Sequence, residues 1–193
     1  MDSVIEKIDK NLLLAINGWH SPIVGKIMWQ ISHQIIWIPL FIFFLYFTLK
    51  KYKNKNVILF FIGVGLCFLF ADRLSVMGFK NVVMRYRPSH NSDIKHLLHL
   101  HSFGNGHYYA GGLYGFVSSH AANFFALSTF LYLNFKSYSK WWVLVFIWAA
   151  LISYSRVYLG VHYPTDVICG GILGIFIGFI VFKLLTKFTP FKQ

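Results

Sequence analysis

The sequence predicts an all-α integral membrane protein: a helical bundle of about five transmembrane helices, preceded by an amphipathic helix on the membrane surface. Of its 193 residues, 56% are hydrophobic and 20% are aromatic, which is too apolar for an ordinary soluble domain. Several apolar runs approach the ~20 residues that span a hydrocarbon core as a helix. Lysines gather in the short links between these runs. We expect one membrane-embedded domain over residues 1–193.

Residues 1–26 are expected to lie in the membrane interface. Charged side chains such as Asp2 and Glu6 interrupt an apolar pattern that includes Ile8, so the segment resembles neither a secretory signal nor a span. This mixture is typical of an amphipathic interfacial helix. A sixth, partly buried segment between residues 12 and 30 is the minor alternative.

Five spans follow in order. The apolar runs centre on residues 31–49, 57–79, 117–135, 141–158 and 165–187. An odd number of spans places the two chain ends on opposite sides of the membrane.

The net charge of +12 is unevenly distributed. Lysines follow the first, third and fifth predicted spans without any accompanying acid, namely Lys50, Lys51, Lys53, Lys55, Lys136, Lys140, Lys183, Lys187 and Lys192. The positive-inside rule makes these links cytoplasmic, so the opposite ends face the periplasm or cell exterior. This distribution argues against nucleic acid as a partner, and no protein partner is inferred.

Two cations mark the outer end of the second span. Lys80 and Arg87 are seven residues apart, about two helical turns, which predicts that both project along one stripe. Pro88 biases the residue before it away from helix. Snorkelling of both side chains to the membrane interface would explain their position. It would not explain why two further polar clusters occur on the same side of the membrane. Arg85 lies off the stripe and is interpreted as an interface anchor or a contact for a larger head group.

A helix start with anion-binding character opens the third span. Ser118 and Ser119 are good N-cap residues, and the free N–H groups and dipole of a helix N-terminus favour an anion. His120 follows within the first turn, where it can give a proton to a bound group. The alternative interpretation of His120, if it stood alone, is a polar residue at the membrane interface without a chemical role.

The segment Ser155–Asp166 places three complementary side chains between two apolar runs, where ionisable groups are costly and indicate a site. Arg156 can hold an oxyanion in a planar fork. His162 can act as nucleophile or proton carrier near neutral pH, and Asp166 can orient its ring. The alternative is a set of interfacial residues in which the aspartate complements a helix dipole.

The three clusters together resemble the signatures of the type 2 phosphatidic acid phosphatase superfamily. Residues 80–88 fit K-x6-RP, residues 118–120 fit the core of PSGH, and residues 155–166 fit SR-x5-H-x3-D. The match covers about half the chain, and the presence of all three in order is highly specific. Val117 and Ser119 stand where the family has proline and glycine.

The resemblance implies a role for each matching residue. His162 would attack phosphorus and carry a phosphohistidine, Asp166 would orient it, and His120 would protonate the leaving oxygen. The phosphate oxygens would be held by Lys80, Arg87, Ser118 and Arg156, with Ser119 as a weaker contact. The resemblance implies neither a metal nor another cofactor.

Two regions carry further polar residues. Residues 89–115 are predicted to form an outer lid that touches the substrate head group. The clustered histidines of this lid are compatible with zinc, but they lack a closed four-ligand spacing with cysteine. Asp72 and Arg73 fall inside the second predicted span, where we expect them to pair within the bundle; the alternative is that they help to orient Lys80.

The implied activity is that of a lipid phosphate or diphosphate phosphatase at the outer face of the cytoplasmic membrane. Undecaprenyl diphosphate, lipid A and phosphatidylglycerophosphate are all plausible substrates. A lipid phosphotransferase that uses the same intermediate is one alternative. A lipid-phosphate binder or transporter without chemistry is another.

Overall fold

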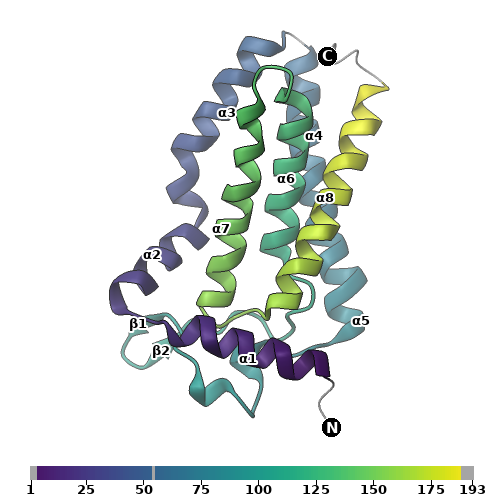
Figure 1. Cartoon of the computed structure of the whole chain (residues 1–193). Helices are drawn as coiled ribbons and strands as arrows, with labels where there is room; N and C mark the ends of the chain where they lie inside the picture. Colours follow the sequence, from purple (N-terminus) through teal and green to yellow (C-terminus); the bar gives the residue numbers. More distant parts are fainter. Residues whose placement is uncertain (1–3, 54, 188–193) are drawn as a thin grey trace.

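The computed structural model describes residues 4–53 and 55–187. Long helices run side by side as a bundle, and α1 crosses one end of it, called here the α1 end (Figure 1). The helices are α1 (Val4–Gly18), α2 (Pro22–Ser32), α3 (Ile38–Lys51), α4 (Lys55–Arg73), α5 (Asn81–Val83), α6 (Ser119–Phe135), α7 (Leu144–Tyr158) and α8 (Pro164–Thr186). A π-helical stretch, η2 (Leu74–Lys80), joins α4 to α5.

Short elements fill the connections. They are the 3-10 turns η1 (Gln34–Trp37), η3 (Pro88–His90), η4 (Lys95–Leu97) and η5 (Lys140–Val143), and the strands β1 (Ser102–Gly104) and β2 (His107–Tyr108). The two strands pair antiparallel as a small hairpin within the predicted lid. This hairpin is a minor departure from an all-α fold.

The predicted membrane bundle is confirmed, and the protein is a multi-pass membrane protein. Among the described residues, three stretches are long and apolar enough to cross a membrane, namely Lys55–Val83, Lys140–Tyr158 and Pro164–Thr186. The pair Pro22–Ser32 and Ile35–Lys51, bent by 70°, gives a fourth if it forms one span. Helix α6 corresponds to the third predicted span, 117–135, but it has only 17 residues and is not among these candidates. Helix α2 overlaps residues 12–30, the region of the alternative sixth segment.

Glycines bring α8 against α6. A Cβ atom on Gly174 would lie 2.3 Å from the carbonyl oxygen of Ala122, and one on Gly178 would lie 2.3 Å from that of Ala126. A Cβ on Gly170 would meet the Ser118 carbonyl at 2.6 Å. Only glycine permits this approach. The contact sets the first turns of α6 and α8 beside each other at the α1 end.

Helix α1 presents an apolar stripe to the outside. Val4, Ile5 and Ile8 are 74%, 66% and 54% exposed. Such a stripe suits a helix lying in the membrane interface, which stays a prediction. The opposite face is buried and largely polar, because it carries Asp9 and Asn17.

The lysine-bearing links gather at the end of the bundle opposite α1, together with the end of α8 (Figure 1). The three motif clusters lie at the α1 end. This separation is what the charge pattern predicts. Asp2 and Lys192, which entered that pattern, lie outside the described residues.

Candidate active site

His162 and Asp166 come together where α7 turns into α8. Gly160, with a φ of +70°, allows the tight turn. Pro164 opens α8, so Asp166 falls in its first turn. The Asp166 Oδ2 atom lies 3.3 Å from His162 Nδ1 and accepts the Tyr163 N–H at 3.0 Å. Both the histidine and the aspartate are buried.

His162 lies in a positive field. Burial lowers the pKa of His162 well below its ordinary range, and three nearby cations lower it further. They are Arg87, Arg156 and Lys80. A hydrogen bond to the backbone of Gly115 acts in the opposite direction. Burial and the three cations therefore favour the neutral form of the ring, whose Nδ1 atom faces Asp166.

Two buried arginines lie near this ring without a carboxylate of their own. Arg87 donates from Nε to the Tyr114 carbonyl at 3.1 Å and from Nη1 to the Val161 carbonyl at 3.4 Å. Arg156 is 2% exposed and donates from Nη2 to the Tyr109 hydroxyl at 2.9 Å. Within residues 4–53 and 55–187, neither arginine forms an ion pair, and Arg156 Nε has no hydrogen-bond partner. Buried charges of this kind favour an anion.

A second contact holds Arg156 from the other side. Its Nη1 atom donates to the hydroxyl of Ser32, at the end of α2. Together with Tyr109 of the lid, Ser32 fixes the guanidinium between two elements far apart in sequence. The sequence did not indicate either partner.

The route from Lys80 to Arg87 differs from the predicted one. Helix α5 ends at Val83, and Met84 adopts a left-handed conformation with a φ of +50°. The two cations therefore do not share a helical stripe, although the charge of Arg87 still acts on Lys80. The turn at Met84 brings Arg87 back toward the bundle, where its N–H donates to the Leu113 carbonyl at 3.0 Å.

The start of α6 supplies serine hydroxyls and a histidine. The Lys80 ammonium donates to the Ser119 hydroxyl at 2.6 Å, and that hydroxyl lies 2.7 Å from Ser75 Oγ. His120 lies within electrostatic reach of both His162 and Lys80. Ser118 is fully buried, where its hydroxyl caps α6 and its N–H donates to the Asp166 carbonyl at 2.9 Å. Its backbone N–H is therefore not available to a bound phosphate.

Arg85 does not occupy the position expected from the sequence. It is not an interface anchor, because Nη1 donates to Asp166 Oδ1 at 3.1 Å and Nη2 to Asp9 Oδ2 at 2.6 Å. The interior pairing expected for Asp72 and Arg73 is also wrong. Both are exposed, and no ion pair to either is found in the part of the chain that the structure describes.

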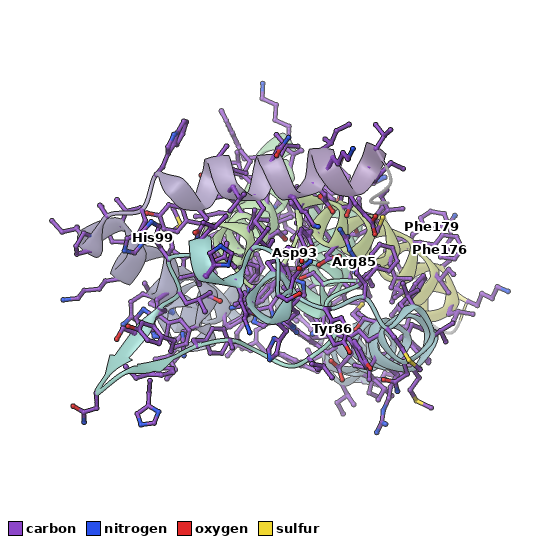
Figure 2. All side chains as sticks on the ribbon, turned by 90° about the horizontal axis from the view of Figure 1, so that it is seen from below. Arg85, Tyr86, Asp93, His99, Phe176 and Phe179 are labelled. Carbon is purple, nitrogen blue, oxygen red and sulfur yellow. The ribbon has the colours of Figure 1, made fainter. Side chains whose placement is uncertain are left out.

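The lid packs on α1 and α2. His99 stacks on His20 with ring centroids 4.9 Å apart, and His101 stacks on Trp29 at 4.1 Å. Figure 2 views this end of the molecule, with His99 beside the turn that follows α1. No cluster of three or more potential metal ligands occurs among the described residues.

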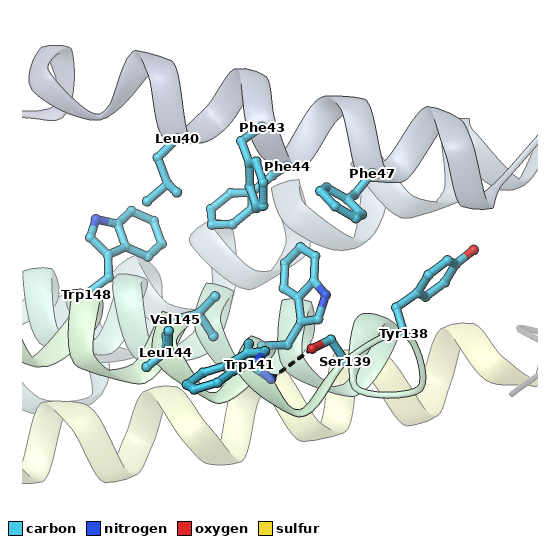
Figure 3. Close-up of a pocket in the computed structure, with 11 residues that line it drawn as sticks. Leu40, Phe43, Phe44, Phe47, Tyr138, Ser139, Trp141, Leu144, Val145 and Trp148 are labelled. Carbon is cyan, nitrogen blue, oxygen red and sulfur yellow. Dashed lines mark hydrogen bonds between the residues drawn. The ribbon is translucent and has the colours of Figure 1, made fainter.

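A separate groove lies between α3 and the start of α7, toward the lysine end. It has a volume of about 440 Å³, and aromatic side chains such as Phe43, Phe47 and Trp148 line it (Figure 3). Its lining contains no acid, base or histidine. The groove shares no residue with the three motif clusters at the α1 end.

Comparison with known proteins identifies the family. The PAP2 superfamily matches residues 72–190, which include all three motif clusters. The chain belongs to this superfamily. It is 36% identical to a lipid A 4'-phosphatase of Bacteroides thetaiotaomicron, over 100% of this chain and 84% of that protein. A lipid A 4'-phosphatase of Porphyromonas gingivalis is 34% identical over 95% and 75% of the two chains.

A solved PAP2 structure shares the fold. The transmembrane PAP2-type phosphatidylglycerolphosphate phosphatase from Bacillus subtilis superposes with a TM-score of 0.67 and 21% identity, covering 99% of this chain and 90% of that one. The family expected from the three motifs is thus confirmed. The chain is a lipid phosphatase of the PAP2 superfamily.

Proposed function

We propose that this PAP2 phosphatase removes a phosphate from lipid A through a phosphohistidine on His162, without a metal ion. The observation that carries the proposal is a buried histidine 3.3 Å from a carboxylate, within the field of two arginines that form no ion pair among the described residues. A phosphate group between them would supply the missing negative charge. Positioning and neutralisation of phosphate oxygens are the main requirements of phosphoryl transfer.

In the first step, His162 Nε2 attacks phosphorus in line with the lipid oxygen. The N–P bond forms as the P–O bond to the lipid breaks. His120, which the bound phosphate anion keeps protonated, gives its proton to the departing oxygen and becomes neutral. Asp166 accepts the Nδ1 hydrogen bond and stabilises the positive ring.

The cradle holds the phosphate oxygens during this transfer. Charge on those oxygens is offset by Lys80, Arg87 and Arg156, which replace the metal ion of other phosphoryl-transfer sites. As the first residues of α6, Ser119 and His120 have backbone N–H groups that no acceptor within the helix can satisfy. Ser118 contributes through its hydroxyl, because its N–H is bound to the Asp166 carbonyl.

In the second step, water resolves the intermediate. His120, now neutral, takes a proton from water as its oxygen attacks phosphorus, and the N–P bond breaks. Inorganic phosphate leaves and His162 Nε2 regains its lone pair. The cycle needs no oxidant and no cofactor.

Substrate and orientation rest on separate observations. Two relatives that align over most of their length are named lipid A 4'-phosphatases, which supports lipid A over the other candidate lipids. The lysine links at the far end of the bundle support a site that faces outward from the cytoplasmic membrane. The apolar stripe of α1 would hold the site at head-group level.

The test is phosphate release from purified lipids by the full chain in detergent. We expect kcat/KM to be highest with lipid A, compared with phosphatidylglycerophosphate and undecaprenyl diphosphate, and we expect turnover to persist in EDTA. Strict dependence on added zinc or magnesium would exclude the mechanism. A higher kcat/KM with another lipid would exclude lipid A as the preferred substrate. Transfer of the phosphate to a second lipid, in place of its release, would indicate a phosphotransferase.

A further inference from the structure

A buried acid of α1 reaches the first turn of α8. Asp9 is only 1% exposed. Its Oδ1 atom accepts the Thr165 N–H at 3.0 Å, and its Oδ2 atom accepts the Thr165 hydroxyl. A carboxylate here satisfies an unpaired N–H and complements the positive end of the helix dipole. Asp9 therefore acts as a cap for α8 from a helix more than 150 residues away.

Arg85 joins this acid to the aspartate of the site. Its Nη2 atom donates to Asp9 at 2.6 Å, and its Nη1 atom donates both to Asp166 Oδ1 at 3.1 Å and to the Thr165 hydroxyl at 2.8 Å. The guanidinium also lies 4.0 Å from the centre of the Tyr163 ring. These contacts fix both the position and the plane of the fork.

Two carboxylates of the protein itself pair with the charge of Arg85. Burial lowers the pKa of Arg85, but the two carboxylates Asp166 and Asp9 raise it on balance. Arg87 and Arg156 have no such partners among the described residues. Arg85 therefore lacks the unpaired character that makes those two arginines suitable for a substrate phosphate.

The two oxygens of Asp166 have separate tasks. Oδ2 faces His162 and the Tyr163 N–H, while Oδ1 is held by Arg85. Rotation of the carboxylate away from His162 would break the bond to Arg85. The orientation of the His162 ring thus depends on a chain of contacts that begins in α1.

We propose that Arg85 and Asp9 are positioning residues for the His162–Asp166 pair, and that helix α1 is part of the catalytic machinery. The proposal rests on the proposed function, because it takes His162 as the nucleophile. Figure 2 places Arg85 beside α1 at this end of the molecule. Loss of the contact would slow phosphoryl transfer without weakening the hold on the phosphate.

The test measures kcat and KM separately, with lipid A and with a small soluble aryl phosphate. We expect Arg85→Gln to lower kcat by about tenfold to a hundredfold, as loss of an orienting partner commonly does, with KM within about twofold. Arg85→Lys should lose less, because it keeps the charge but not the fork. Guanidinium added to Arg85→Ala should restore part of kcat, which a purely structural role would not produce.

A double-mutant cycle tests the role of α1. Asp9→Asn should also lower kcat, and the pair Asp9→Asn/Arg85→Gln should be no worse than Arg85→Gln alone, because both act through one chain of contacts. The matched control is Asp93→Asn. Asp93 pairs with Lys10 of α1 at 3.1 Å but is exposed, so its loss should leave kcat unchanged.

Three results would overturn the proposal. One is a rise in KM for lipid A alone with unchanged kcat, which would make Arg85 a head-group contact. The second is a fall in kcat that guanidinium does not restore and that is accompanied by a lower thermal midpoint of the variant, which would indicate a purely structural role. The third is strict additivity of the two substitutions. Failure of the proposed function would instead be seen as turnover that survives removal of the His162 ring.

Discussion

Replacing His162 with asparagine is expected to lower kcat for phosphate release by about 10⁴-fold or more, because the nucleophile is lost. Asparagine retains an N–H that can point at Asp166, so the buried hydrogen bond is kept while Nε2 is removed. Phosphate release from lipid A and from an aryl phosphate measures the effect. Both substrates should be affected, because both need the nucleophile.

The control for this substitution is His99→Gln. His99 lies in the lid, stacked on His20, and takes no part in the proposed chemistry. Both variants should keep the thermal midpoint of the wild type in detergent. Loss of a nucleophile should leave far less than about a tenth of the wild-type kcat. If His162→Asn kept that much activity, His162 would not carry the phosphoryl group.

His120→Asn is expected to lower kcat with lipid A by about 10²- to 10⁴-fold, the usual range for a lost general acid. Formation of the phosphoenzyme from an aryl phosphate should be far less affected, because a weakly basic phenolate leaves without a proton. Rapid-quench measurement of the first turnover separates this step from hydrolysis. Equal losses of the first step with both substrates would show that His120 does not protonate the leaving oxygen.

Local spacing allowed part of the site to be predicted. His162 and Asp166 are four residues apart across one helix start, so their contact follows from the chain itself. Local patterns failed where the chain changed conformation. The prediction that Lys80 and Arg87 share a stripe assumed that the helix continues to Arg87, but α5 ends at Val83.

The missing part of the site depends on distant segments. Arg85 lies 76 positions from Asp9 and 81 from Asp166, and no periodic pattern links those positions. Asp9 looked like one charge of an amphipathic helix. Its four-residue spacing from Leu13 and Asn17 placed all three on one face, which was the available signal for a buried polar contact. Ser32 and Tyr109 gave no comparable sign before folding placed them on Arg156.

The most direct test of the account is to trap the covalent intermediate. In His120→Asn, an aryl phosphate should still phosphorylate the enzyme, while hydrolysis slows because water lacks its general base. Mass spectrometry after an alkaline quench should then find one phosphate on His162, stable to base and labile to acid, and none in the variant that also carries His162→Asn. Phosphate on another residue, or turnover by His120→Asn with no phosphoenzyme at any time, would contradict the phosphohistidine mechanism.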